Sequence, residues 1–234
     1  MKSPMSGAEP IRDLEAWNKN DSLKETHNCF TYSMNVVDKE LIKKCNETVD
    51  CKVGFHQPGY ASGYGHFPEK RRKGCIDMVS RMWGDNPDVR TIKFHQRCPE
   101  STSKIALIVD PKRDYHFLRQ DKVERNEEEN GTWSHKPGSM DVTTKDASGR
   151  PILRPDRALF IYKNSKEPLE YTKFCGYYCV PRGKPLFLMS DARIKGGSME
   201  LSETLAKTGG ASSSFPQPTR YQQTRRKSRG ENHS

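Results

Sequence analysis

The chain changes character near residue 103, and this change limits the folds that are open to it. Upstream, apolar residues recur at helical spacing. Downstream, the segment 103–110 contains the unbroken apolar run 105–109, which is typical of a buried strand. Further downstream segments rich in aromatic and β-branched residues are predicted as strands: 113–121, 132–138, 157–163 and 171–181. Helices followed by antiparallel strands predict an α+β domain.

Two helices are expected in the upstream part. The first has one apolar stripe, with residues four, three, four and four positions apart, and should end near residue 45: Phe30, Met34, Val37, Leu41 and Cys45. The segment 74–87 predicts a second helix, stopped by Gly84 and Pro87.

Composition suggests one packed domain with loose ends. Hydrophobic residues make up 32% of the chain and the mean hydropathy is -0.93. We therefore expect an N-terminal extension over 1–25, an α+β domain over 26–195 and a low-complexity basic tail over 196–234.

The tail concentrates positive charge in a chain whose net charge is +10. Such a segment predicts electrostatic binding of nucleic acid without sequence specificity, of an anionic lipid surface or of an acidic protein groove. The residues expected to take part are Arg220, Arg225, Arg226, Lys227 and Arg229.

The cysteine count and the chain ends predict a soluble, intracellular protein. There are seven cysteines, an odd number, and no apolar stretch typical of a signal peptide lies near the N-terminus. No run is long enough to span a bilayer. We expect mostly free thiols, with local pairs Cys45–Cys51 or Cys175–Cys179 as alternatives.

A zinc site is a weaker alternative. The spacings His-x2-Cys at 95–98 and Cys-x3-Cys at 175–179 lack a tight Cys-x2-Cys knuckle, so neither a metal nor a cofactor is expected. Regular alternation would place Phe174, Gly176 and Tyr178 on one face of a strand. Cys175, Tyr177 and Cys179 would then lie on the other face.

Cys29 stands at the predicted start of the first helix. Asn28 is a good N-cap, so Cys29 falls in the first turn, beside backbone N–H groups without helical partners. The helix dipole there should lower the pKa of the thiol, and the N–H groups should hold a developing oxyanion. This environment favours a nucleophilic thiol over a core cysteine.

Two histidines are candidates for the base that such a thiol needs. His116 and His135 lie on neighbouring predicted strands of a hairpin whose loop is centred near residue 126. They should share one face, with Cβ atoms ~5 Å apart. One imidazole would then face the thiol while the other orients it.

These features resemble the papain-like cysteine hydrolases, in particular the NlpC/P60 branch. The stretches NCFTYSMN, GFHQPGYASGY, DYHFLRQD, TWSHKPG and FCGYYCVP also resemble an uncharacterised group of that superfamily found in bacteria and large DNA viruses. The resemblance implies Cys29 as nucleophile, His116 as general base and His135 as orienting partner. Asn28, Gln57 and Trp133 are candidates for the oxyanion site or the cleft.

The resemblance implies a thiol hydrolase of a peptide or amide bond. The alternative is a non-catalytic assembly component that keeps the fold and binds neighbouring subunits through its extensions, for example a minor capsid protein packaged in a virion. A sulfur close to a His116 nitrogen in an open cleft would favour the enzyme.

Overall fold

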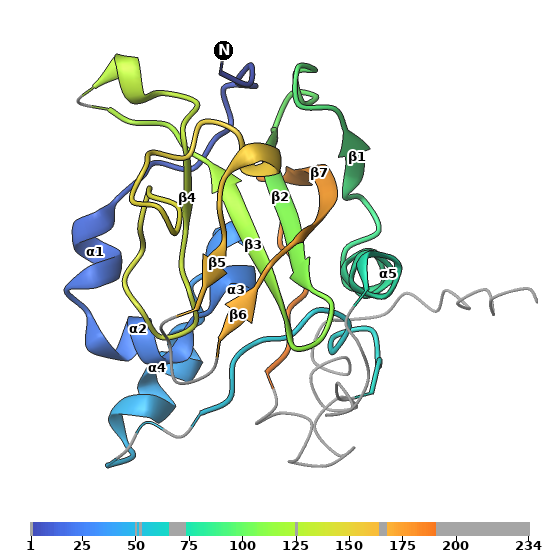
Figure 1. Ribbon diagram of the computed structural model, residues 1–234. Coiled ribbons are helices and arrows are strands. Elements are labelled where there is room, and N and C mark those ends of the chain that lie inside the picture. The colour runs from blue at the N-terminus through green and yellow to red at the C-terminus, as the bar shows by residue number, and fades with distance from the viewer. Residues whose placement is uncertain are drawn as a thin grey trace, which may run out of the picture. The chain divides into compact units, whose positions relative to one another are not determined.

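The central feature is a five-stranded antiparallel sheet with the strand order β1-β7-β2-β3-β4 (Figure 1). The structure is a computed structural model that describes residues 2–49, 51, 53–65, 74–124, 126–163 and 168–190. The strands of the sheet are β1 (Arg90–Ile92), β2 (Thr102–Asp110), β3 (Asp114–Gln120), β4 (Trp133–His135) and β7 (Lys173–Pro181). A separate two-stranded sheet pairs β5 (Ile161–Tyr162) with β6 (Leu169–Glu170).

The helices precede the sheet in sequence, so the predicted α+β class is confirmed. They are α1 (Leu14–Asn18), α2 (Asp21–Thr26), α3 (Cys29–Met34), α4 (Lys39–Asn46) and α5 (Cys75–Asp85), with short 3-10 turns at Glu127–Glu129 and Pro155–Arg157. The described residues belong to one unit, Met1–Gly197. The predicted tail, residues 196–234, lies outside the described residues, which end at residue 190.

The prediction of one continuous helix from Phe30 to Cys45 is wrong. The chain leaves α3 at Asn35, which adopts a left-handed conformation with φ of 57° and closes the helix. Asp38 then caps a new helix, α4, by accepting a hydrogen bond from Leu41 N. Val37, expected in the apolar stripe, is 47% exposed because it lies in the link between the two helices.

The sheet carries a hydrophobic core on each face. On one face, Phe30 and Met34 of α3 and Met78 and Met82 of α5 pack against Phe117 and neighbouring strand residues. The other face is covered by the segment that contains β5 and β6. In Figure 1 α3 lies behind β3, and β5 and β6 lie in front of it.

A bulge in β7 decides where its cysteines point. Leu107 pairs with Gly176, but Ile108 pairs with Phe174, so Cys175 is the extra residue. Gly176 has φ of 139°, and Tyr178 packs with Cys175 on the α5 face. The regular alternation expected for 174–179 is therefore wrong, because the bulge shifts it by one residue.

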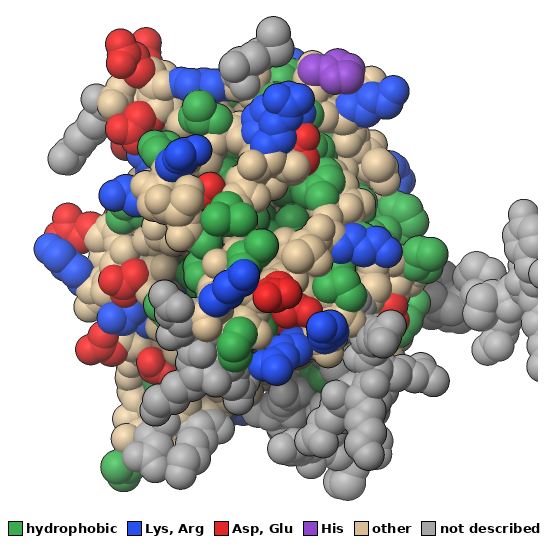
Figure 2. Space-filling model, in the orientation of Figure 1, with side chains coloured by type: hydrophobic (Ala, Val, Ile, Leu, Met, Phe, Trp, Pro, Cys, Tyr) green, Lys and Arg blue, Asp and Glu red, His purple; other side chains and the backbone are tan. Residues whose placement is uncertain are grey.

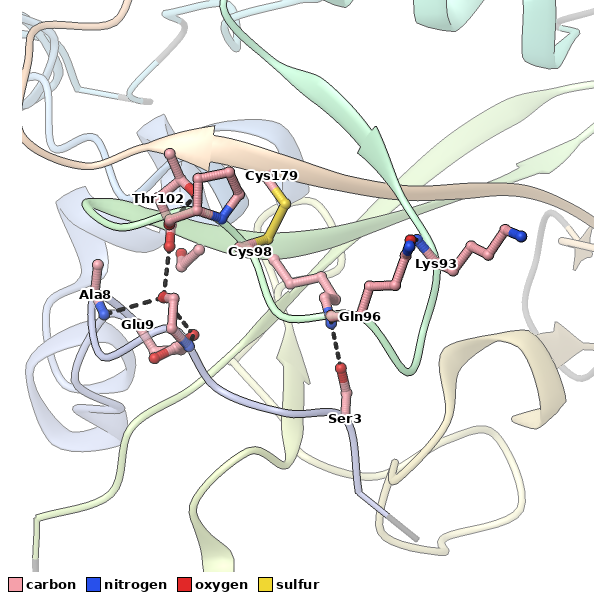
Figure 3. The surroundings of a disulfide bond; sticks show 12 residues. Ser3, Ala8, Glu9, Lys93, Gln96, Cys98, Thr102 and Cys179 are labelled. Atoms are coloured by element: carbon pink, nitrogen blue, oxygen red, sulfur yellow. Dashed lines mark hydrogen bonds between the residues drawn. A yellow bond between two sulfur atoms is a disulfide. The ribbon is translucent and has the colours of Figure 1, made fainter.

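All cysteines except Cys29 form disulfides: Cys45–Cys51, Cys75–Cys175 and Cys98–Cys179. The local pair Cys45–Cys51 agrees with one expected alternative, whereas Cys175–Cys179 does not form. Cys75 ties α5 to β7, and Cys98 ties the loop after β1 to the same strand (Figure 3). Because these cysteines form disulfides, they are not the free thiols that were expected, and they are not available as zinc ligands.

The disulfides also argue against the expected intracellular location, because disulfides form and persist in oxidising compartments. None of the helices in the described part of the chain has the length and apolar character of a membrane-spanning segment.

The N-terminal segment, expected as a loose extension, packs onto the domain beside the Cys98–Cys179 bond (Figure 3). Ser3 is buried and donates a hydrogen bond to Phe94 O, and the buried Lys104 ammonium donates to Ser3 Oγ and to Phe94 O. Glu9 accepts hydrogen bonds from Ser6 N and Ser6 Oγ. These buried polar contacts make the segment part of the fold rather than an arm.

We expect the Cys75–Cys175 disulfide to contribute more stability than Cys45–Cys51. The two bonds close loops with sequence separations of 100 and 6 residues, and cross-links that close longer loops restrict the unfolded chain more. Replacing Cys75 and Cys175 by Ser should lower the free energy of unfolding by about 2–5 kcal/mol. Urea unfolding of the oxidised variants measures this, with Cys45→Ser/Cys51→Ser as the matched control. Equal losses in the two variants would contradict this account.

Candidate active site

A cavity of about 600 Å³ opens near the start of β3. Its walls come from the start of α3, the segment 55–60, the start of β3, the turn after β4 and the region of β6. The lining residues are Asn28, Cys29, Phe55, Gln57, Tyr60, Asp114, Tyr115, His116, Pro137, Gly138, Ser139, Met140, Leu169 and Tyr171. Cys29 and His116, far apart in sequence, thus share one cavity.

Asn28 fixes the start of α3. Its Oδ1 accepts hydrogen bonds from Phe30 N and Thr31 N, and its Nδ2 donates to His56 O. The predicted N-cap is confirmed. The same bonds occupy two of the N–H groups that were expected to hold an oxyanion, so those two groups do not serve that role.

Two arginines, the buried Arg119 and the half-buried Arg182, fix the other end of α3. Arg182 donates to the carbonyls of Ser33 and Met34, and Arg119 donates to the carbonyl of Tyr32. These carbonyls belong to the last turn of the helix, and Tyr32 O also accepts a hydrogen bond from Asn35 N. Arg119 also lies over the Tyr32 ring, 3.9 Å from its centroid. α3 is therefore held at both ends, which sets the position of Cys29.

The two histidines meet as expected from the hairpin. Leu118 pairs with His135 across β3 and β4, so His116 is a diagonal neighbour of His135 on the same face. His116 Nε2 lies 2.7 Å from His135 Nδ1, and His135 Nε2 lies 3.0 Å from Lys145 O. Both side chains are buried.

These contacts determine the tautomers of the neutral rings. A carbonyl only accepts, so His135 Nε2 carries a hydrogen and His135 Nδ1 is the acceptor. His116 Nε2 must then donate, which leaves the lone pair of His116 on Nδ1. His116 Nδ1 has no hydrogen-bond partner among the described residues and is not among the polar atoms sealed from solvent.

Among the described residues, no hydrogen bond joins Cys29 Sγ to the His116 or the His135 ring. Cys29 Sγ lies 4.0 Å from Tyr115 O, and Cys29 packs on the face that holds Tyr115 and Phe117. His116 projects to the other face, where its ring lies near those of Phe160 and Tyr171. β4 pairs only with Leu118–Gln120, so the earlier part of β3 has no partner strand on that side. The cavity lies at this unpaired part and is lined by both Cys29 and His116.

The expected lowering of the Cys29 pKa is wrong for this state. Burial, with a further contribution from the Asp114 carboxylate, raises the pKa of the thiol to about 12. Burial lowers the pKa of His135 to about 4, and burial together with His135 lowers the pKa of His116 well below its ordinary value. The resting site therefore holds a neutral thiol and two neutral imidazoles.

Of the other residues expected in the cleft, Gln57 lies in the cavity wall and Trp133 lies in the hydrophobic core. Gln57 lines the cavity, and its Oε1 accepts a hydrogen bond from Tyr115 Oη, which leaves its amide nitrogen as a donor. Trp133 is fully buried in the core cluster with Leu118 and Tyr177, away from the cavity wall.

Two of the lining residues, Asp114 and Tyr171, were not predicted from the sequence. Tyr171 Oη donates to Asp114 Oδ2 at 2.6 Å, and this pair forms the wall beside His116. Asp114 starts β3 and directly precedes Tyr115 and His116. This position next to His116 is the sequence feature that could have identified Asp114 as a lining residue.

The described residues contain no group of three or more His, Cys, Asp or Glu that is placed to hold a metal ion. The basic tail residues, Arg220 to Arg229, lie outside the described part of the chain. On the face shown in Figure 2, hydrophobic side chains gather in the middle and Lys and Arg lie around them, with Asp and Glu interspersed.

We expect His116 and His135 to remain neutral well below pH 6. An unfolded histidine has a pKa of ~6.5, so the unfolded chain binds more protons as the pH falls toward 4. The free energy of unfolding should therefore decrease as the pH falls from about 6.5 to about 4. Nitrogen-resolved NMR should show His116 protonated at Nε2 and bare at Nδ1 at pH 7. Titration of either ring near pH 6.5 in the folded protein would contradict the assignment.

Comparisons with known proteins place the chain in a family. No protein-family model matches the chain, and no solved structure matches it. The chain is similar to insoluble matrix shell protein 1 of the mollusc Ruditapes philippinarum, with 31% identity over 146 residues. The alignment covers 62% of this chain and 77% of the relative. At this identity and coverage, the chain belongs to the same family as insoluble matrix shell protein 1.

Proposed function

We propose that the cavity is the active site of a papain-like thiol hydrolase that cleaves an amide or peptide bond. The proposal depends on one observation: hydrogen bonds from His116 through His135 to Lys145 O leave the His116 Nδ1 lone pair free in a cavity that the free thiol Cys29 also lines. A fixed tautomer with a free lone pair is what a general base requires.

In the proposed reaction, the Cys29 side chain turns from Tyr115 O toward His116 Nδ1 when a substrate enters. Catalytic hydrogen bonds are often long in the free enzyme and tighten only in the complex. His116 takes the thiol proton, Sγ attacks the carbonyl carbon, and the leaving amine receives that proton. Water, activated by the same imidazole, then hydrolyses the thioester.

Gln57 supports this reaction as the oxyanion donor. Tyr115 Oη binds Gln57 Oε1 and thereby fixes which end of the amide accepts. The amide nitrogen then remains available to a negatively charged oxygen in the cavity. This role replaces the helix N–H groups that Asn28 occupies.

The hydrolase is tested by variants assayed against a library of fluorogenic peptide amides. We expect Cys29→Ala to abolish hydrolysis and His116→Gln to lower kcat/KM by about 10²–10⁴-fold, because the thiol then lacks its base. His135→Ala should cause an intermediate loss, and His95→Gln, at an exposed position, should have no effect.

An inert wild-type protein would contradict the proposal. The specific outcome is that it neither cleaves any member of the library nor forms a Cys29 adduct with a peptidyl vinyl sulfone, as detected by intact mass.

A second candidate function is that of a structural component of an extracellular matrix, with or without catalysis. The name of the relative favours it, and so do disulfides, which fit an oxidising environment. The neutral resting thiol is also compatible with a site that has no catalytic role. The assembly named here is a matrix rather than the virion expected from the sequence.

The matrix proposal predicts that incorporation does not require the thiol. Epitope-tagged wild-type and Cys29→Ala proteins, secreted by cells that deposit a matrix, should both remain in the pellet after detergent extraction. Cys75→Ser/Cys175→Ser should shift the protein toward the soluble fraction, because the fold is weakened. Recovery of the wild-type protein in the soluble fraction alone would contradict a matrix role.

A further inference from the structure

The end of α5 holds the loop that forms one wall of the cavity. Asp85, the last residue of α5, is 4% exposed. Its Oδ2 accepts a hydrogen bond from Gly59 N at 2.6 Å, and its Oδ1 accepts from Ser62 N at 2.8 Å and from Ser62 Oγ at 2.9 Å. The same loop supplies Gln57 and Tyr60 to the cavity wall. One buried carboxylate therefore fixes the turn that follows Gln57.

The position of Asp85 is unfavourable for the helix itself. A carboxylate at the C-terminal end of a helix opposes the helix dipole, which favours cations there. Burial raises the pKa of Asp85, and hydrogen bonds from Gly59 and Ser62 act in the opposite direction. A buried carboxylate is costly unless hydrogen-bond donors compensate it. Because the loop supplies those donors, its contact with α5 accounts for an acid at this place.

Two glycines allow the loop to lie against the last turns of α5. A Cβ atom on Gly84 would lie 2.6 Å from Ser62 Oγ, and one on Gly59 would lie 2.8 Å from Arg81 Cγ. Gly59 also has φ of 89°, a conformation that favours glycine. Its carbonyl accepts hydrogen bonds from Ser62 Oγ and Tyr64 N, which close the turn. The turn and the helix are in direct contact, so the loop has little room to move relative to α5.

The next residue, Asn86, holds a second support for Gln57. Asn86 Nδ2 donates to Phe187 O, and Asn86 Oδ1 accepts from Phe187 N, both at 3.0 Å. Two residues further along, Met189 O accepts a hydrogen bond from Gln57 N at 3.1 Å. The backbone of Gln57 is therefore held between the segment that Asn86 binds and the turn that Asp85 binds. Its side chain lines the cavity.

We propose that Asp85 is a positioning residue: by holding the turn 59–62, it directs the Gln57 amide toward the oxyanion that forms when Cys29 attacks. The inference rests on the proposed hydrolase function for the reaction that Gln57 serves. Asp85 is not among the described residues that line the cavity, so its effect on the reaction passes through Gln57. The fixed position of Gln57 is a property of the resting protein and can be measured without turnover.

The reaction test is a double-variant cycle on a peptide amide that the wild-type protein cleaves. Gln57→Ala should lower kcat by about 10²–10³-fold, as expected when an oxyanion donor is lost. Asp85→Asn should lower kcat by about 10–100-fold with little change in KM, because a misplacement of ~1 Å can cost about 10²-fold in rate. In the Gln57→Ala background, Asp85→Asn should have no further effect on kcat. A merely structural role for Asp85 would instead give losses that multiply.

The resting protein is tested by nitrogen-resolved NMR of the Gln57 side-chain amide, assigned by its loss in Gln57→Ala. Its signals should move toward random-coil positions in Asp85→Asn, because the new Nδ2 cannot accept the hydrogen bonds that a carboxylate oxygen accepts. Ser62→Ala, which removes one of those bonds, should cause a smaller shift. Asp88→Asn is the matched control, because Asp88 follows three residues later and pairs with Lys184 at the surface. It should leave the Gln57 signals and kcat unchanged.

Unmoved Gln57 signals in Asp85→Asn would overturn the inference, and so would equal kcat losses from this change in the wild-type and Gln57→Ala backgrounds. If the wild-type protein cleaves no peptide, the hydrolase proposal fails, and the Gln57 signals alone decide whether Asp85 positions this side chain. If Asp85→Asn fails to fold, Ser62→Ala provides both readouts. Its loss in kcat should be about two- to tenfold and should vanish in the Gln57→Ala background; unmoved signals or a loss that persists would overturn the inference.

Discussion

The position of α3 is the constraint on which the rest of the site depends. A helix of six residues does not form by itself in water, because too few hydrogen bonds offset the ordering of its first turn. Here Asn28 occupies donors at one end, and Arg119 and Arg182 occupy carbonyls at the other. Desolvation, with a further contribution from the Arg119 guanidinium, lowers the pKa of Arg182 to about 9. Cys29 is thereby held against β3 by contacts spread over the whole domain.

The second half of the site depends on a short strand. Because β4 is only three residues long, it pairs with the far part of β3 and leaves the near part open to the cavity. The same three residues bring His135 to His116, and Lys145 O sets the direction of the hydrogen bonds between them. The cavity therefore opens where the pairing of β4 with β3 stops, and Cys29 and His116 both line it.

Local patterns in the sequence were sufficient for much of this arrangement. The apolar run of β2, the strand character of β3 and β4, and the shared face of His116 and His135 follow from alternation and from a hairpin centred near residue 126. Asn28 as a cap follows from its place before an apolar stripe. These features depend on residues close together in the chain.

Features that depend on distant residues or on one backbone angle could not be predicted. The left-handed Asn35 splits an apolar stripe that reads as continuous, and the bulge beside Gly176 turns Cys175 toward Cys75. Cys75 and Cys175 are 100 residues apart, so their spacing in the sequence does not predict the disulfide between them. The raised pKa of Cys29 depends on burial that no helix-start pattern reveals.

The most direct test of the central claim is a crystal structure of the protein with Cys29 covalently modified by a peptidyl electrophile. The account predicts that the Cys29 side chain turns away from Tyr115 O, that the peptide occupies the cavity, and that His116 Nδ1 lies within ~3.5 Å of Sγ or of the atom bonded to it. An adduct in which the β3 backbone still separates the sulfur from both imidazoles would contradict it.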